Sequence, residues 1–363
     1  MIRRFFILVL ATYLVPLTAS ADVGHSAVIL QYHHVSETTP PSTSVTPAEF
    51  EQHLDWLAEN DFEVLPLPTI VSKLRQQQSF SSDKVVAITF DDANVSVCEQ
   101  AWPILKKRKL PFTLFISTEM IERQYSSQCS WQDLKEMTDS GLMVPANHSH
   151  QHSHMIVTAE HGYSYEQWRA EAIKEITTAQ NLLEAQLGWS SQLFAYPYGE
   201  YNTALAAIVT ELGYTGFNQS TGAAGYLSDF AALPRIPVSS QYAALNTLSV
   251  KLLSLPFPGD FLPEHPNPII LDSAANPLKV RVKSHAGFEH VLKRTSCFNS
   301  SGAPISTTLT ANELLISAEQ PLKRGRHKYT CTAPSGKDGR WYWGSFQWLI
   351  SDNGTAVIEP AVH

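Results

Sequence analysis

Hydrophobic and polar positions form alternating strand-like and helix-like blocks from residue 27 to about residue 250. The most apolar block is 85–92, VVAITFDD, in which five of the first six residues are apolar and two carboxylates follow. A continuous apolar run of this kind is typical of a strand that is buried on both faces of a parallel sheet. The same reading predicts further strands at 28–32, 112–117, 193–198 and 214–218.

Helical patterns separate these predicted strands. Thr46 and Glu49 form a capping box with Pro47 at the first helical position, and Gly188 follows the longest helical stretch, 165–187. Other helices are predicted at 96–108, 130–140 and 203–212. Repeated βα units predict a parallel sheet, and their number predicts an α/β fold in which that sheet closes into a (β/α) barrel.

The pattern changes after Leu253. Five prolines in 255–268 predict a linker, and the remaining 269–363 predict a small antiparallel β-sandwich. Its strands are expected at 268–271, 278–283, 290–293, 307–309, 314–318, 329–332 and 344–350. Trp341 and Trp343 share one strand face there. They either present rings to a sugar or fill the core, and the core interpretation is favoured.

The amino terminus resembles an export signal. Residues 1–21 join two arginines to a short apolar run and end in Ala19–Ser20–Ala21, which predicts cleavage after Ala21. No later segment is long and apolar enough to cross a bilayer. The net charge of −8 becomes −10 without Arg3 and Arg4, and no basic stripe favours nucleic acid as a partner. We therefore expect a periplasmic or extracellular protein.

Four cysteines fit an oxidising compartment. Their positions favour pairing Cys98 with Cys129 and Cys297 with Cys331, although four cysteines allow three connectivities. A thiolate metal site is the alternative, but no Cys-x-x-Cys spacing supports it.

A histidine cluster offers metal ligands. Residues 147–154 read NHSHQHSH, and two pairs, His148/His152 and His150/His154, have the i, i+4 spacing with which a helical turn binds one ion. The carboxylate of Asp92 is a candidate third ligand. Three protein ligands and one water make an open catalytic zinc site. A solvated histidine-rich loop is the alternative.

Two other strand ends carry candidate groups. In 194–200, FAYPYGE, Pro197 and Gly199 favour a turn that directs the Tyr198 N–H into a pocket, or simply a tight turn. In 31–35, QYHHV, either His33 or His34 is a candidate proton donor, although a lone histidine is more often structural.

Together these motifs resemble the polysaccharide deacetylases of carbohydrate esterase family 4, the NodB-homology group, over residues 27–250. The matching motifs are TFDD at 89–92, H-S-x-x-H at 148–152 and PYG at 197–199. The resemblance implies a distorted barrel of that family. It implies that Asp91 is the base, that Asp92, His148 and His152 hold the metal, and that the Tyr198 N–H helps bind the oxyanion. The flanking Asn147 and Ser149 favour this histidine register.

The late Leu-x-His-Asp motif of the family is not found in order here. The YHHV segment resembles that element moved to the front, as in the permuted branch acting on poly-β-1,6-N-acetylglucosamine, and this implies that His33 is the general acid. Two positions depart from the family pattern: Ala93 replaces a glycine, and Ala195 replaces an arginine. Arg235 is a candidate brace for Asp91, or else a surface ion pair.

The sequence therefore predicts a secreted hydrolase that removes N-acetyl groups from an N-acetylglucosamine polysaccharide, with residues 22–254 as the catalytic domain. One divalent ion is implied, most directly Zn²⁺, with Co²⁺ or Ni²⁺ as alternatives. Peptidoglycan or chitin fragments are alternative substrates. A catalytically silent sugar-binding protein on the same scaffold is the alternative of a different class. The sequence sets no oligomeric state.

Overall fold

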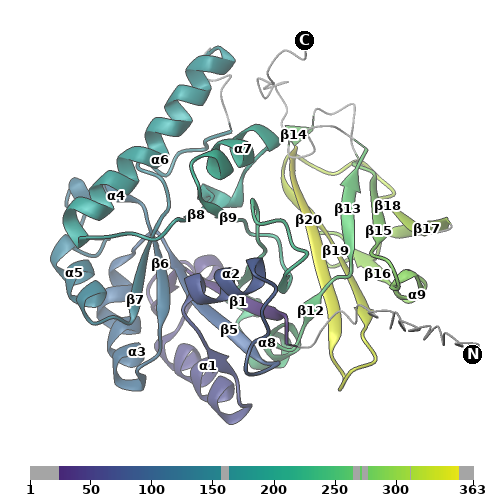
Figure 1. Ribbon diagram of the computed structural model, residues 1–363, viewed down its shortest axis with the longest axis horizontal. Helices are drawn as coiled ribbons and strands as arrows, with labels where there is room; N and C mark the ends of the chain where they lie inside the picture. The colour runs from purple at the N-terminus through teal and green to yellow at the C-terminus, as the bar shows by residue number, and fades with distance from the viewer. Residues whose placement is uncertain (1–23, 157–162, 265–269, 272–276, 311, 351–363) are drawn as a thin grey trace, which may run out of the picture.

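The computed structural model describes residues 24–156, 163–264, 270–271, 277–310 and 312–350. One large sheet wrapped by helices lies beside two smaller sheets (Figure 1). The predicted signal peptide, residues 1–21, lies outside the described residues. Within the described ranges, no helix has the length and hydrophobicity that a membrane span requires.

The large sheet has nine strands in the order β10-β1-β5-β6-β7-β8-β9, with β11 also paired to β1 and β4 to β5. Only the β1–β10 pair is antiparallel. The sheet curls into a half-barrel, which confirms the predicted α/β class. Its strands are β1 (Ser26–Tyr32), β4 (Glu63–Val64), β5 (Val85–Asp91), β6 (Phe112–Ile116), β7 (Met143–Asn147), β8 (Leu193–Ala195), β9 (Thr215–Phe217), β10 (Ala224–Gly225) and β11 (Ile236–Pro237).

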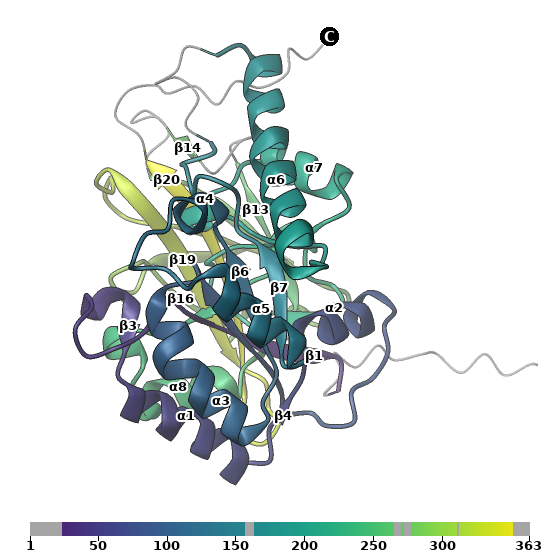
Figure 2. The same cartoon turned by 90° about the vertical axis from the view of Figure 1, so that its left-hand side faces the viewer.

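Helices cover the outside of this sheet (Figures 1 and 2). The Thr46 capping box starts α1, and Gly188, at φ +87°, ends α6 as predicted. The predicted 96–108 helix instead begins as a π-helical segment, Val97–Ala101, because Pro103 has no N–H to donate. The helices are α1 (Pro47–Glu59), α2 (Leu67–Arg75), α3 (Trp102–Arg108), α4 (Thr118–Glu122), α5 (Trp131–Asp139), α6 (Tyr165–Leu187), α7 (Thr203–Glu211) and α8 (Leu245–Leu252).

The segment 233–237 spans the gap between the two ends of the curled sheet. Leu233 bridges to Phe217 at the end of β9, and β11 then pairs with β1 in parallel. Gly216 makes the close approach possible, because a Cβ there would lie 2.0 Å from the Ala231 oxygen. Arg235 lies between the two attachments and is therefore held at the barrel interior, fully buried.

The carboxyl-terminal part is built from two further sheets. One has five strands, β12-β20-β19-β16 with β14 on β20, and the other has the order β13-β15-β18-β17. Most pairs are antiparallel, but β12 and β14 run parallel to β20. The strands are β12 (Leu255–Pro256), β13 (Gly259–Pro263), β14 (Ile270–Leu271), β15 (Val280–Ser284), β16 (Ser296–Phe298), β17 (Ser306–Thr310), β18 (Glu313–Ser317), β19 (Gly325–Pro334) and β20 (Trp341–Ile350).

Two expectations for this part are corrected. The described residues of 255–268 do not form a linker: β12 and β13 lie there, and Leu255 and Phe257 belong to the core of the carboxyl-terminal part. The strand expected at 290–293 is the short helix α9 (Glu289–Leu292). The prolines of 255–268 misled the first interpretation, because proline is tolerated at strand starts and edges as well as in linkers.

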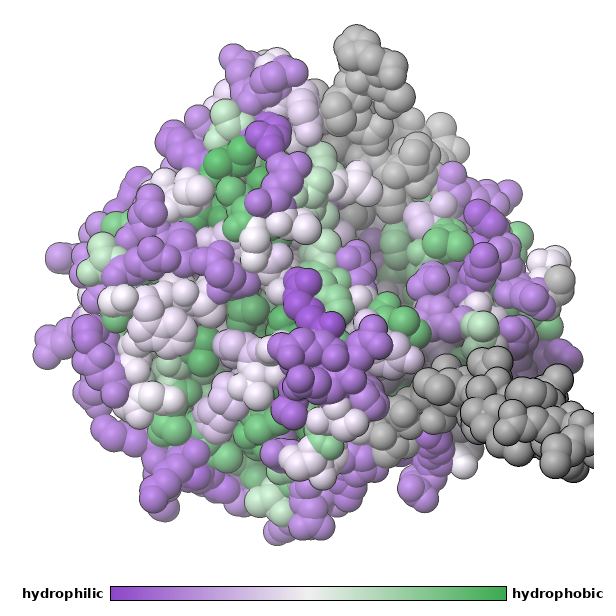
Figure 3. Space-filling model, viewed as in Figure 1, coloured by the Kyte–Doolittle hydropathy of each residue, from purple (hydrophilic) through white to green (hydrophobic). Residues whose placement is uncertain are grey.

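Some aromatic residues of β20 fill the core, and others are accessible, as a sugar-binding surface would require. Trp348 and Tyr342 are buried in the core, whereas Trp341 is 40% exposed. Trp343 lines a cavity of about 540 Å³ between the two parts of the molecule. In the space-filling view, hydrophilic side chains cover much of the outer rim, with hydrophobic residues in patches between them (Figure 3).

Both predicted disulfides are present. Cys98 pairs with Cys129 next to the helical segment that follows β5, and Cys297 pairs with Cys331 across β16 and β19. The first bridge ties down the chain just beyond the two carboxylates, because the Cys129 N–H also donates to the Ala93 oxygen at 2.9 Å.

Candidate functional site

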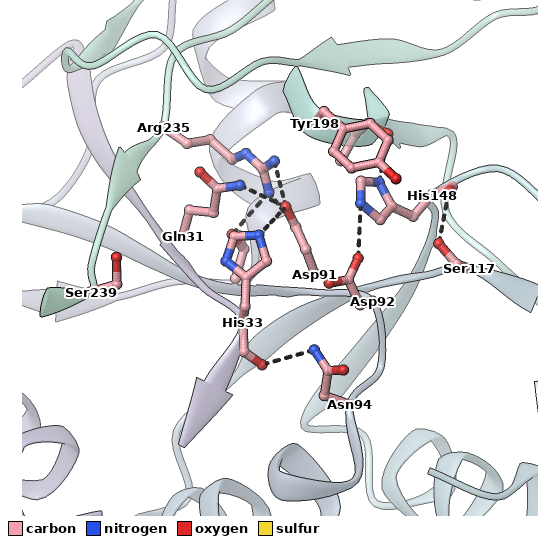
Figure 4. A network of polar contacts seen from close by, with 12 residues as sticks. Gln31, His33, Asp91, Asp92, Asn94, Ser117, His148, Tyr198, Arg235 and Ser239 are labelled. Carbon is pink, nitrogen blue, oxygen red and sulfur yellow. Dashed lines mark hydrogen bonds and ion pairs between the residues drawn. The ribbon is translucent and has the colours of Figure 1, made fainter. Parts of the chain in front are cut away.

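The candidate site lies where parallel strands end. Asp91 is the last residue of β5, His33 follows β1, His148 follows β7, and Tyr198 lies in the turn after β8. Carboxyl ends of parallel strands meet at one edge of the sheet, where α/β proteins place their ligands. Figure 4 shows these side chains converging from separate strands on a common centre.

Asp92, His148 and His152 form one cluster, with a ligand atom of each within 4.8 Å of the others. The Asp92 Oδ1 atom lies 3.4 Å from His148 Nε2 and 3.2 Å from His152 Nε2. One carboxylate and two imidazoles are a common donor set for a catalytic zinc ion, with a position left for water.

The hydrogen bonding of His148 fits such an ion. Its Nδ1 lies 2.7 Å from the Ala195 carbonyl oxygen, which can only accept, so Nδ1 carries the proton. In its neutral form the ring turns a lone pair on Nε2 toward Asp92 Oδ1, a buried atom that accepts no hydrogen bond from the described residues. Two facing acceptors repel each other unless a cation lies between them, so the residues present fit a metal ion.

The histidine loop reaches this arrangement without a helix. Ser149 and His152 have left-handed backbones, at φ +66° and +55°, so the expected helical turn is wrong. The alternative pair points elsewhere: His150 Nδ1 lies 2.8 Å from Thr118 Oγ1, and His154 Nδ1 lies 2.7 Å from Glu200 Oε2. Geometry therefore joins Asp92 to His148 and His152 and leaves out His150 and His154.

A buried clamp holds Asp91. Arg235 Nη1 donates to Oδ1 at 2.6 Å, Arg235 Nη2 donates to Oδ2 at 2.8 Å, and Gln31 Nε2 donates to Oδ2 at 2.6 Å (Figure 4). Both charged side chains are fully buried. Arg235 is thus not a surface ion pair. It makes a bidentate contact with Asp91. The arginine that the family has in its third motif is replaced here by Ala195, so Arg235 supplies this contact from another part of the chain.

The clamp keeps Asp91 ionised and leaves one acceptor site open. Burial opposes ionisation, but the Arg235 guanidinium, followed by His148 and His33, lowers the pKa of Asp91 below its ordinary value of 3.8. Within the described part of the chain, Oδ2 accepts two hydrogen bonds and Oδ1 only one. Oδ1 therefore retains a lone pair for a water molecule.

The two adjacent histidines face different neighbours. His33 Nε2 lies 3.9 Å from Asp91 Oδ2, too far for a hydrogen bond, and its side chain is 21% exposed. His34 begins β2 (His34–Val35), which pairs with β3 (Ser44–Val45), and its Nδ1 lies 3.4 Å from Ser96 Oγ. Burial lowers the pKa of His34. Of the two, His33 is the one directed at the carboxylate.

The turn after β8 is a 3-10 segment, Pro197–Gly199, with Tyr198 at φ +58°. The predicted strand therefore ends at Ala195, and the chain turns sharply. The Tyr198 ring lies edge-on to His152, at 4.6 Å between centroids, and stacks on His154 at 4.0 Å. The turn and the histidine loop are thus in direct contact.

The substitution of alanine for glycine after TFDD has a local consequence. Asp92 and Ala93 are both left-handed, at φ +73° and +61°. Glycine adopts this conformation freely, whereas alanine there costs about 1 kcal/mol. The buried Ala93 nevertheless holds it, which leaves the Asp92 carboxylate aimed at the histidines.

Two polar contacts were missed at the sequence level. Gln31 reaches Asp91 from β1, and Glu200 is buried against His154. Gln31 lies two residues before His33, and residues two apart on a strand share a face, so strand periodicity alone marks it as a neighbour of His33. No local pattern marks Glu200.

Comparison with known proteins agrees with this geometry. Residues 79–217 match the family described as polysaccharide deacetylase. Over 272 residues the chain is 27% identical to the poly-beta-1,6-N-acetyl-D-glucosamine N-deacetylase of Staphylococcus aureus strain MSSA476, spanning 65% of this chain and 93% of that protein.

Solved structures share the fold. IcaB from Ammonifex degensii is 25% identical with a TM-score of 0.55, over 63% of this chain and 97% of its own. The Streptococcus pyogenes deacetylase PplD, solved in complex with acetate, is 24% identical with a TM-score of 0.56, over 62% of this chain and 98% of its own.

The buried clamp predicts a specific loss of stability. Replacing Arg235 with methionine leaves the buried carboxylate of Asp91 without a counter-charge. We therefore expect the free energy of unfolding at pH 7 to fall by about 3–5 kcal/mol. The wild type loses this stabilisation only as the pH falls from 3.8 through the lowered pKa of Asp91, while the variant regains stability as Asp91 is protonated, so the difference narrows in acid.

Urea unfolding at several pH values measures this difference. The matched control is Arg281→Met, because Arg281 pairs with Glu313 in an exposed bridge at 3.2 Å and is worth less than about 1 kcal/mol. Equal losses in the two variants, or a loss independent of pH, would contradict the clamp.

Proposed function

The chain contains a polysaccharide deacetylase domain, and from this premise we propose that it is a secreted, metal-dependent enzyme that removes N-acetyl groups from poly-β-1,6-N-acetylglucosamine. The observation that carries the proposal is the metal-ligand cluster of Asp92, His148 and His152 beside the clamped Asp91. Those two features supply the ligands and the base that amide hydrolysis requires.

We propose that Asp92, His148 and His152 hold one divalent ion, with Zn²⁺ the first choice for this donor set and Co²⁺ or Ni²⁺ as alternatives. Such an ion polarises the acetyl oxygen and makes water a better nucleophile at neutral pH. The Ala195 carbonyl oxygen fixes the His148 ring by accepting a hydrogen bond from its Nδ1–H.

Asp91 is proposed as the general base. Its Oδ1 takes a proton from the attacking water while Arg235 and Gln31 hold the carboxylate in one orientation. His33 is proposed as the general acid that protonates the leaving nitrogen, because its Nε2 lies near the carboxylate and its side chain remains partly open to substrate. His34 supports this position through Ser96.

The Tyr198 backbone N–H is proposed to stabilise the tetrahedral oxyanion. It lies at the start of a 3-10 turn, where N–H groups have no partner within the turn. One such donor is typically worth about 3–4 kcal/mol of the barrier. The balanced outcome is cleavage of the amide C–N bond by water, giving acetate and a free amino sugar.

Substrate and location rest on further observations. The named activity of the Staphylococcus aureus relative supports a β-1,6-linked polymer. The two disulfides support an oxidising compartment, in agreement with the export signal predicted at residues 1–21. We propose that residues 22–254 form the catalytic domain and that a carboxyl-terminal accessory domain begins at Leu255, where its core begins.

Acetate release tests the proposed activity. We expect the mature protein to release acetate from poly-β-1,6-N-acetylglucosamine oligomers faster than from chitin oligomers or peptidoglycan fragments. A chelator should abolish release, and added Zn²⁺ should restore it. Faster release from another polymer would reject the substrate assignment, and no release from any of them would reject the enzyme in favour of a sugar-binding protein.

Zinc binding tests the ligand assignment independently of turnover. We expect His148→Gln and His152→Gln to weaken Zn²⁺ binding by more than about 100-fold, since outer partners of ligands alone are worth about 10–100-fold. His150→Gln is the matched control in the same loop, because His150 binds Thr118 instead. Calorimetric titration with zinc chloride measures the affinities, and an equal loss in the control would contradict the assignment.

Replacing Asp91 with asparagine separates the base from the metal site. We expect Asp91→Asn to bind Zn²⁺ but to lose about 100- to 10,000-fold in kcat, the range that general base catalysis supplies. Asp139→Asn is the matched control, because Asp139 is exposed and forms an ion pair with Lys135 on the same helix. A zinc-loaded Asp91→Asn enzyme with wild-type kcat would show that another group is the base.

A further inference from the structure

The carboxyl-terminal part donates two hydrogen bonds to the turn that carries Tyr198. Arg326 Nη1, on β19, donates to the Tyr198 carbonyl oxygen at 2.6 Å. Gln347 Nε2, on the neighbouring strand β20, donates to the Gly199 carbonyl oxygen at 3.1 Å. Two adjacent strands of one sheet thus bind two consecutive carbonyls of a turn in the other part of the molecule.

That turn needs external support. Tyr198 and Gly199 are both left-handed, at φ +58° and +70°. A non-glycine residue in this region is held there only when its surroundings fix it. Gly199 also packs against Gln219, since a Cβ at this glycine would lie 2.6 Å from Gln219 Cγ.

The turn contacts the metal-ligand cluster directly, so its position affects the position of that cluster. The Tyr198 ring lies edge-on to His152 and stacks on His154, with planes 10° apart. The carboxylate of Glu200, buried at the end of the turn, accepts a hydrogen bond from His154 Nδ1 at 2.7 Å and lies 3.9 Å from Arg326 Nε. Arg326 therefore contacts the turn at its backbone and approaches the carboxylate that holds the histidine loop.

The solvent exposure of Arg326 and Gln347 indicates that they position the turn rather than stabilise the whole fold. The Arg326 side chain is 48% exposed and Gln347 is half-buried, so neither belongs to a hydrophobic core. An exposed arginine that binds a single carbonyl contributes little to global stability. Its effect is instead local, on the turn that carries the proposed oxyanion donor, the Tyr198 N–H, and that contacts the proposed metal ligand His152.

We propose that Arg326 and Gln347 are positioning residues, through which the carboxyl-terminal β-sandwich holds the Tyr198 turn in its reactive geometry. The inference rests on the proposed function for its catalytic consequence, but the support of the turn stands on the contacts alone. On this view the sandwich completes the active site from outside the barrel.

Hydrogen exchange of the mature full-length chain tests the support without reference to activity. The reporters are the Gly199 and Glu200 amides, which donate within the turn to Tyr196 and Pro197. In the double variant Arg326→Ala/Gln347→Ala we expect these amides to exchange about tenfold faster, while the amides of β5 are unchanged. Arg281→Ala, whose arginine pairs within the carboxyl-terminal part, is the control and should leave both sets unchanged.

Steady-state kinetics on acetylated oligomers then tests the consequence. We expect kcat of the double variant to fall about 10- to 100-fold with KM within about twofold, because displacement of a catalytic group slows the reaction more than it weakens binding. Arg326→Lys retains a cationic hydrogen-bond donor, and the double variant Arg326→Lys/Gln347→Ala should recover part of the loss.

The two measurements separate the support of the turn from its effect on catalysis. Exchange rates equal to those of the Arg281→Ala control overturn the proposed support, whatever the activity. Faster exchange with unchanged kcat overturns the positioning role. If the wild-type chain releases no acetate, the proposed function is rejected. Hydrogen exchange alone then tests whether Arg326 and Gln347 support the turn.

Discussion

The architecture of the site depends on compensating one buried carboxylate. Asp91 ends a strand that is buried along its whole length, where an unpaired charge is strongly unfavourable. Gln31, on β1, and Arg235, just before β11, supply three hydrogen bonds to it. The ion pair is a condition for having an ionised acid at this depth, rather than a large source of net stability.

The neighbouring Asp92 solves the same problem differently. Its backbone turns to the left-handed region, which directs the carboxylate away from Arg235 and toward two imidazoles. Adjacent acids thus receive different surroundings, one an arginine and the other a pair of imidazole rings. This division allows one carboxylate to stay available to a proton while its neighbour is available to a cation.

Local signals explain what the sequence predicted well. The capping box at Thr46 and the glycine at 188 specify helix ends through contacts within a few residues, and the apolar run before Asp91 specifies a buried strand. The histidine register followed from a motif, although the helical geometry expected for it was wrong. The same local logic failed at 255–268, where the proline-rich chain forms strands because β12 pairs with β20 and β13 pairs with β15.

Contacts between distant residues had no comparable signal. Arg235 lies 144 positions from Asp91, and the residues alone left it open as a surface ion pair. Gln31 and Glu200 were missed because their partners are set by register and turn geometry rather than by spacing. The contact of Arg326 with the Tyr198 turn joins two parts of the molecule that the sequence suggested were separated by a linker.

The place of Arg235 in the chain has a consequence for biosynthesis. This residue belongs to the segment that joins the two ends of the curled sheet, so it reaches Asp91 only when that segment has emerged and docked. A chain that stopped before residue 235 would contain Asp91, Asp92 and all four histidines of 148–154, but Asp91 would lack its counter-charge. The counter-charge of Asp91 therefore arrives only with the segment that joins the two ends of the sheet.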